Sequence, residues 1–173
     1  MKSFVLILLF LCLSAGCAAQ DVCVIDSKTA PVLLNLKLQM SPEQAQSVLG
    51  RDLKIKIKGN GERTFFQNFI EKKAPPSLPG VRALYLRFFD RKLYQIEIFY
   101  ENRNDWRTLE DFTAYVSGNL NLPASSWQTA KGGSEIKCAA ASLAADNVLN
   151  PRIELTDEAI RAQVEAVRQK KNN

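Results

Sequence analysis

The sequence predicts an α+β fold, in which an antiparallel sheet has helices packed mainly on one face. The segment Val81–Glu101 alternates apolar and polar side chains in two runs, which is typical of two β-strands joined by a tight turn. Helix-start signals at Ser41 lie before this hairpin, and apolar residues at helical spacing lie after it, between Leu109 and Leu120. Because strands and helices follow one another in mixed order without a fixed repeat, we expect an α+β class.

The composition is that of an ordinary globular protein, and it excludes several kinds of site. The chain has 173 residues, 46% of them hydrophobic and 24% charged, which fits one domain. Its net charge is +5, with Lys and Arg spread widely, so we expect a solvated surface and no nucleic-acid partner. There is no histidine, which excludes Ser-His and Cys-His nucleophile pairs and histidine-ligated zinc. We expect no metal and no cofactor.

Residues 1–19 have the pattern of a signal peptide. Lys2 precedes the apolar run Phe4–Leu13, which is too short to cross a bilayer as a stable helix. Gly16-Cys17 follows in a stretch of small residues that resembles a bacterial lipobox, in which the cysteine is the lipid attachment site. We therefore expect an exported lipoprotein in the periplasm or at the outer membrane, anchored to the membrane through Cys17. Cleavage after Ala19, giving a secreted or periplasmic protein, is the alternative, and an uncleaved transmembrane anchor is less favoured.

The cysteines also suit export. Cys12 leaves with the signal peptide, so Cys23 and Cys138 are the two that remain whichever cleavage occurs. In an oxidising compartment such a pair most often forms a disulfide. The bond would close a loop of about 115 residues, which the chain-entropy model values at about 4–5 kcal/mol. The alternative is two unrelated buried thiols.

The rest of the chain divides into a tether over residues 20–30, a single α+β domain over residues 31–155, and a C-terminal helix with a frayed tail over residues 156–173. Before the hairpin we expect a strand over Pro31–Leu38 and a lysine-rich edge strand over Asp52–Lys58, because both segments alternate. A short helix between them has a cap, a proline in its first turn, a capping-box partner and a stop signal, at Ser41, Pro42, Gln44 and Gly50.

Thr64–Glu71 predicts one or two helical turns, and the rigid loop Ala74–Gly80 follows it. Its aromatic residues Phe65, Phe66 and Phe69 have two interpretations. In the first they pack onto the sheet. In the second they form an exposed patch that binds a partner.

The register of the hairpin follows from its apolar residues. A two-residue turn of Arg91 and Lys92 would place apolar side chains opposite polar ones, so we favour a three-residue loop, Asp90–Lys92, with Lys92 in the left-handed region. This choice pairs apolar residues across the strands: Leu84 with Ile98, Leu86 with Ile96, and Phe88 with Tyr94. We expect Leu86 and Ile96 to be covered by the helix that presents Phe112 and Val116.

Beyond the hairpin, Asn104-Asp105 predicts the start of a helix that runs to about Leu120. Trp127 lies in a short strand candidate. Three further elements complete the prediction: a strand over Glu135–Ala144 that holds Cys138, a last strand over Arg152–Leu155, and a helix from Asp157 to about Gln169 capped by Thr156.

Two motifs together resemble small exported bacterial lipoproteins of the BamE (SmpA/OmlA) type. They are Leu38-Gln39-Met40-Ser41-Pro42-Glu43-Gln44 with Leu49-Gly50, and Phe89-Asp90-Arg91-Lys92-Leu93. Relative to the family pattern, Gln39 and Arg91 replace glycines and Ala45 replaces a valine. The resemblance covers about residues 34–101. It implies a β-lactamase-inhibitor-protein-like fold, with helices on one face of an antiparallel sheet, and it implies binding of other proteins rather than catalysis.

Paired carboxylates are the only candidates for chemistry, at Glu110-Asp111 and Asp157-Glu158. Each pair lies in the first turn of a predicted helix, where it stabilises the helix dipole. We therefore expect no enzymatic activity, and a non-enzymatic module that binds another envelope protein. The alternative is a secreted or periplasmic hydrolase that uses a carboxylate pair.

Overall fold

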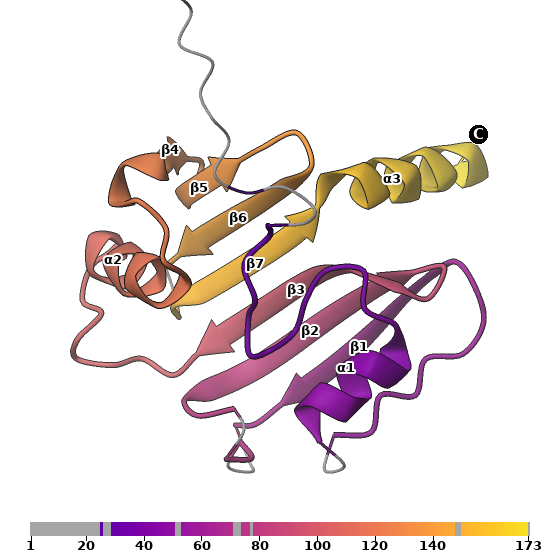
Figure 1. The fold of residues 1–173 in the computed structure, drawn as a ribbon, viewed down its shortest axis with the longest axis horizontal. Helices are drawn as coiled ribbons and strands as arrows, with labels where there is room; N and C mark the ends of the chain where they lie inside the picture. The colour runs from indigo at the N-terminus through magenta and orange to yellow at the C-terminus, as the bar shows by residue number, and fades with distance from the viewer. Residues whose placement is uncertain are drawn as a thin grey trace, which may run out of the picture.

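The computed structural model describes residues 25, 29–50, 53–70, 74–76, 78–147 and 150–172. These residues form a seven-stranded antiparallel sheet in the order β1-β2-β3-β7-β6-β5-β4, with α-helices α1 to α3, which confirms the α+β class (Figure 1). The strands are β1 Glu62–Asn68, β2 Val81–Phe89, β3 Lys92–Tyr100, β4 Gln128–Ala130, β5 Gly133–Lys137, β6 Ala141–Asp146 and β7 Arg152–Asp157. The helices are α1 Pro42–Leu49, α2 Leu109–Leu120, α3 Glu158–Asn172 and the short 3-10 helix η1 Ala124–Ser126.

The sheet is built from two halves that meet where β3 pairs with β7. The strands β1 to β3 precede the joint in sequence, and β4 to β7 follow it. One row of apolar side chains crosses six neighbouring strands on the core face of the sheet and is buried along its whole length: Phe65, Leu86, Ile96, Leu155, Leu143 and Ile136. This row makes the two halves one hydrophobic core.

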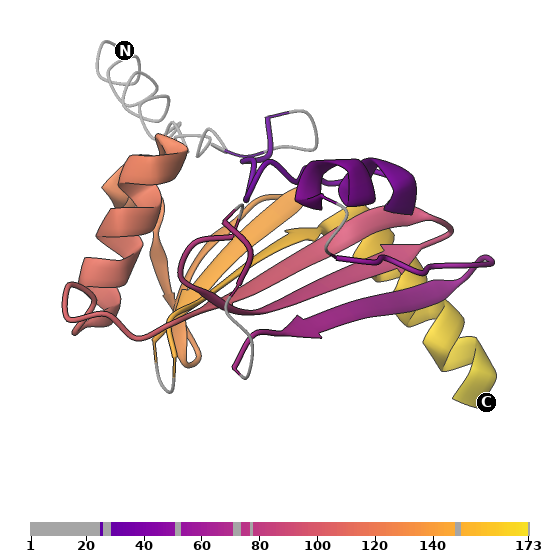
Figure 2. The same ribbon diagram turned by 90° about the horizontal axis from the view of Figure 1, so that it is seen from below.

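The helices lie on both faces of the sheet, two on one and one on the other. Ala45 and Leu49 of α1 and Phe112 and Val116 of α2 belong to the same buried cluster as the apolar row. Helix α3 lies on the opposite face, which we call the open face, where Ile160 and Val164 form a separate cluster with Tyr94 (Figure 2). The prediction that helices pack mainly on one face therefore holds for α1 and α2, whereas α3 covers one end of the other face.

The capping signals locate α1 correctly and α2 only in part. Ser41 and Gln44 form the predicted capping box, and Gly50 ends α1. Helix α2 begins at Leu109 rather than near Asn104, because Thr108 and Asp111 bond each other's backbone N–H groups in a capping box of their own. It contacts β5 and β6, so the prediction that it covers Leu86 and Ile96 was wrong.

The hairpin register is confirmed along most of its length but wrong at the turn. Leu84 pairs with Ile98 and Leu86 with Ile96, as predicted, but Phe88 pairs with Leu93. The turn has two residues, Asp90 and Arg91, with φ of 45° and 64°, and Lys92 has no positive φ. Two positive φ values match the twist of a tight hairpin. A bulge at Tyr94 then restores the apolar register and directs Tyr94 to the open face, beneath α3.

Two predicted strands before the hairpin are absent among the described residues. In Pro31–Leu38, Leu34 and Asn35 have positive φ, and the chain turns back so that Leu33 bridges Leu36. In residues 53–58, Leu53 is buried, Ile55 and Ile57 are partly buried and the lysines between them are exposed, but these residues belong to no strand. Both segments bury apolar side chains without joining the sheet.

Three other elements also differ from their predictions. Thr64–Glu71 was predicted to be helical, but most of its described part belongs to strand β1. The strand predicted over Glu135–Ala144 is two strands, β5 and β6, with Cys138 where β5 ends. Trp127 precedes β4, and β7 is central in the sheet. Asp157 rather than Thr156 caps α3, since its Oδ1 accepts the Ile160 N–H at 3.0 Å.

The signal peptide, the tether's cysteine Cys23 and the lipid site Cys17 lie outside the described residues, so these predictions stay predictions. Within the part of the chain that the structure describes, no helix is both long and apolar enough to cross a bilayer.

Candidate functional site: the open face of the sheet

The open face presents polar and aromatic side chains in register across the strands. One row crosses from the edge strand β1 to β5 and consists of Phe66, Tyr85, Glu97, Glu154, Ala144 and Glu135. A neighbouring row places Ala83, Phe99, Arg152 and Asp146 next to one another. Helix α3 covers only one end of this face, so these two rows form its uncovered part (Figure 2).

An aromatic cluster occupies the β1 side of the open face. The ring of Phe66 stacks on Tyr85 with 4.3 Å between ring centres, and Tyr85 meets Phe99 edge-on at 5.8 Å. Phe66 is 49% exposed, unlike the other two phenylalanines of the predicted patch. Such a stack supplies apolar contact area with few rotatable bonds, which is what protein interfaces use.

A charged cluster lies beside the aromatic one and is organised by Arg152. Its guanidinium donates to Glu97 Oε1 at 2.8 Å and to Asp146 Oδ2 at 2.6 Å, and Nη1 lies 3.8 Å from Glu154 Oε2. Glu97 and Glu154 are directly opposite each other, an arrangement that is unfavourable for like charges unless a cation lies between them. Burial lowers the pKa of Arg152, but its bonds to Glu97 and Asp146 outweigh burial and hold the pKa above its usual value.

A small hollow of about 110 Å³ adjoins this cluster, between the β4–β5 turn and the side chains of Asp146 and Arg152. Pockets that bind small molecules have volumes of roughly 300–1,000 Å³. The hollow is therefore too small to be a substrate cleft.

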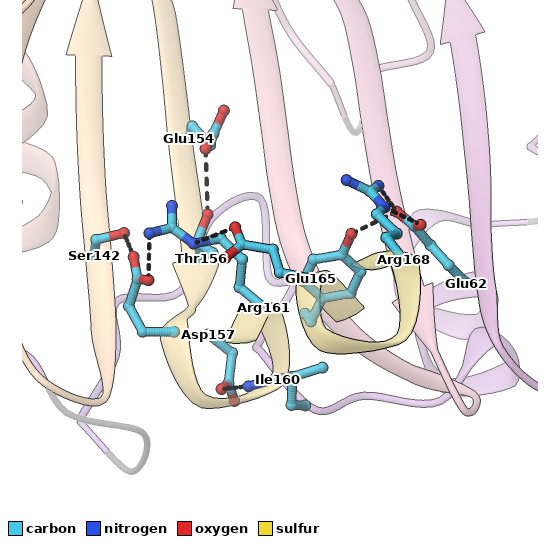
Figure 3. A network of polar contacts seen from close by, with 11 residues as sticks. Glu62, Ser142, Glu154, Thr156, Asp157, Ile160, Arg161, Glu165 and Arg168 are labelled. Atoms are coloured by element: carbon cyan, nitrogen blue, oxygen red, sulfur yellow. Dashed lines mark hydrogen bonds and ion pairs between the residues drawn. The ribbon is translucent and has the colours of Figure 1, made fainter. Parts of the chain in front are cut away.

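Helix α3 is fastened to the open face by polar contacts (Figure 3). Glu62 of β1 accepts hydrogen bonds from the Tyr94 hydroxyl at 2.8 Å and from Arg168 Nε at 3.0 Å. Glu158 accepts from Ser142 of β6 and forms an ion pair with Arg161 at 2.7 Å. The contacts reach both ends of the helix.

These contacts also set two pKa values. Burial raises the pKa of Glu62, but the bonds from Arg168 and Tyr94 outweigh burial, and the pKa is lowered. Burial, followed by the bond to Glu62, raises the pKa of Tyr94 to about 12. The folded protein therefore stabilises the protonated form of Tyr94 and the ionised form of Glu62.

The two predicted carboxylate pairs have structural roles. Asp111 completes the α2 capping box, and Asp157 caps α3 and accepts a bond from Gln39 Nε2 at 3.1 Å. No group of three or more His, Cys, Asp and Glu side chains that could hold a metal occurs among the described residues.

The three phenylalanines of the predicted aromatic patch do not lie together on the surface. Phe65 and Phe69 are 9% and 8% exposed and pack in the core, because alternate residues of a strand point to opposite faces. Only Phe66 lies on the open face. Part of the remaining face could be predicted from the sequence, since the predicted register already placed Tyr85 opposite Glu97. The cluster around Arg152 had no such signal, because it joins β3, β6 and β7.

A second, apolar hollow of about 210 Å³ lies on the other side of the molecule, between α2 and residues 32–34. Val32 and Tyr115 are exposed at this hollow, and Tyr100 lines it with its pKa raised by burial and then by Tyr115. Cys138, which follows directly after β5, is disulfide-bonded.

No protein family model, curated protein or solved structure matches this chain. The resemblance to BamE-type lipoproteins therefore rests on the two sequence motifs alone.

Proposed function

We propose that this protein is an exported, lipid-anchored cell-envelope protein that acts as a non-enzymatic protein-binding module. Its binding surface is the uncovered part of the open face, centred on Phe66. The observation that supports this most is that Phe66 is half exposed yet fixed in place by its stack on Tyr85, at the edge of the sheet. A rigid, exposed aromatic side chain beside polar and charged groups is the composition of a protein–protein interface.

The alternative, a hydrolase that uses a carboxylate pair, has less support. Glu97 and Asp146 accept hydrogen bonds from the same guanidinium, so neither is free to act as an acid or a base on a substrate. The adjoining hollow of about 110 Å³ would not enclose a substrate. Charges that are already paired, beside a hollow of this size, favour binding over catalysis.

Export is supported by the sequence and by one cysteine. Residues 1–19 have the signal pattern, and Cys138 is disulfide-bonded, which is typical of proteins outside the cytoplasm. The resemblance to BamE-type lipoproteins would imply the same location.

Site-specific photo-crosslinking in cells tests the binding surface. A photoreactive phenylalanine analogue at Phe66 should give a discrete adduct with another envelope protein. The matched control is the same analogue at Tyr115 of α2, which is 41% exposed and lies away from the open face. Equal adducts at both positions, or none at Phe66, would contradict the proposal.

Mass spectrometry of the mature N-terminal peptide tests the anchor. We expect a lipid-modified Cys17 at the N-terminus, and the Cys17→Ala variant should not be lipidated. A free N-terminus at Gln20 would instead show cleavage after Ala19.

A further inference from the structure

Strand β1 has backbone N–H and C=O groups that form no hydrogen bonds with another strand of the described structure. It is an edge of the sheet and pairs only with β2. The Phe69 N–H donates to the Arg82 carbonyl at 2.8 Å, so the alternation of an antiparallel ladder directs residues 63, 65 and 67 toward β2. The N–H and C=O groups of Thr64 and Phe66 therefore point outward, and no partner for these four groups lies among the described residues.

The carbonyl groups at the two ends of this outward row accept hydrogen bonds from local side chains. The Glu62 carbonyl accepts from Arg63 Nη1 at 2.8 Å, and the Asn68 carbonyl accepts from Gln67 Nε2 at 3.0 Å. The open part is thus the middle of the strand, where Phe66 lies.

The two edges of the sheet are protected to different degrees. Strand β4 is three residues long and is followed directly by the Lys131-Gly132 turn, so it offers little for another strand to pair with. Strand β1 is seven residues long, pairs with β2 without a bulge, and contains no proline. Its stretch Thr64–Asn68 has no charged residue, and Phe66 and the nearby Ile70 are 49% and 61% exposed. These are the features of an edge that accepts a strand.

Positive charge runs beside this edge. The segment that contains Lys54, Lys56 and Lys58 passes alongside β1 in both views of the fold, and these three side chains are exposed (Figures 1 and 2). Arg63 reaches the same segment, with its Nε 3.3 Å from the Lys58 carbonyl oxygen. A second copy of the chain would bring two such rows together and be repelled, whereas a negatively charged segment would be attracted.

We propose that β1 binds an extended, acidic segment of a partner protein as an additional strand, with an apolar side chain of that segment packed on Phe66. This inference rests on the proposed binding function and specifies its mode. The backbone groups of Thr64 and Phe66 supply the hydrogen bonds, the lysine row supplies the charge preference, and the Phe66–Tyr85 stack supplies the apolar contact.

A synthetic heptapeptide with alternating Glu and Val and a central Phe is the probe. Its binding to the mature protein should slow amide hydrogen exchange at Thr64 and Phe66. Phe65 and Gln67 are internal controls, because their N–H groups already point to β2 and should change little. Raising the salt concentration should weaken binding, since the lysine row is exposed.

Two N-methylated versions of the peptide test strand addition without altering the protein. They carry N-methyl groups on alternating residues and so block opposite edges of the peptide. One version should bind like the parent peptide, and the other should bind at least tenfold more weakly. Equal binding of both would overturn the proposal.

Protein variants provide the second test. Thr64→Pro removes one outward N–H and no bond to β2, and it should weaken peptide binding at least tenfold while leaving the fold intact. Phe66→Ala should also weaken binding about tenfold, and Thr113→Ala on α2 is the matched control with no effect. Reversing Lys54, Lys56 and Lys58 to Glu should abolish the preference for an acidic peptide.

The outcomes separate this inference from the proposed function. If crosslinks form at Phe66 in cells while Thr64→Pro binds the peptide normally, the binding surface stands and strand addition is wrong. Failure of the peptide to bind at millimolar concentration also overturns strand addition. So does a dimer of the chain that Thr64→Pro converts to a monomer, because the occupant would then be a second copy.

Discussion

The guanidinium of Arg152 bonds the carboxylate of Glu97 at 2.8 Å across the joint between the two halves of the sheet. Glu97 is 7% exposed, and the residue directly opposite it in β7 is another carboxylate, Glu154. Without Arg152, two negative side chains would face each other at the joint, one of them buried. The ion pair therefore stabilises the pairing of β3 with β7 as well as shaping the open face.

A double-mutant cycle on Arg152 and Glu97 should show this role. We expect Arg152→Ala to lower the free energy of unfolding by about 1–3 kcal/mol, because it leaves a buried carboxylate unpaired. Adding Glu97→Gln should recover part of the loss. The same cycle on the exposed pair Arg103 and Asp105 is the control, and its coupling energy should stay below about 1 kcal/mol. Equal coupling in the two cycles would mean that Arg152 is only a surface charge.

The turn geometry gives a second prediction. Arg91 has φ of 64°, which costs a non-glycine residue free energy, whereas Lys92 is an ordinary residue of β3. Arg91→Gly should therefore raise the free energy of unfolding by about 1 kcal/mol, and Lys92→Gly should lower it by about 0.5–1 kcal/mol. Because Arg91 also pairs with Glu43, both substitutions belong in a Glu43→Ala background. Chemical denaturation measures the difference, and the three-residue loop predicts the opposite signs.

The elements that the sequence predicted well are those with a local cause. The box at Ser41 and Gln44 involves side chains three residues apart, and the pairing of Leu86 with Ile96 follows from alternation within one hairpin. The bulge at Tyr94 could not be seen, because a two-residue turn with a bulge and a three-residue loop give the same register beyond the turn.

The predictions failed in segments whose side chains are buried but whose backbone does not form the hydrogen bonds of a strand. The leucines of Pro31–Leu38 alternate because they are buried, but the backbone turns at Leu34 and Asn35 instead of pairing with a strand. The Phe65-Phe66 pair suits a helix or a strand equally when only a few residues are considered. The segment forms a strand because it pairs with the neighbouring strand β2. The site around Arg152 depends on β7 lying between β3 and β6, a long-range order that no local pattern shows.

Tyr94 predicts a loss of stability at alkaline pH. Its pKa is raised from 10 to about 12, so the folded protein holds the phenolic proton more tightly than the unfolded chain does. The stabilisation is complete below pH 10 and is lost as the pH rises from 10 to 12. Urea unfolding at pH 9 and pH 11.5 measures it. The Tyr94→Phe variant should lose less stability over this interval, and identical losses would contradict the prediction.

The last prediction concerns the disulfide of Cys138, because its partner must be a cysteine that remains after the signal peptide is cleaved. We predict that the partner is Cys23, the other cysteine that remains under either cleavage. Thiol titration of the unfolded, unreduced mature protein should find neither cysteine free, and peptide mapping should show them joined. Cys23→Ser, Cys138→Ser and the double variant should each lose about 4–5 kcal/mol of stability, since removing either sulfur breaks the same bond. A bond between Cys138 and Cys17 would contradict this pairing and also the lipid anchor, because a sulfur in a disulfide cannot hold a lipid.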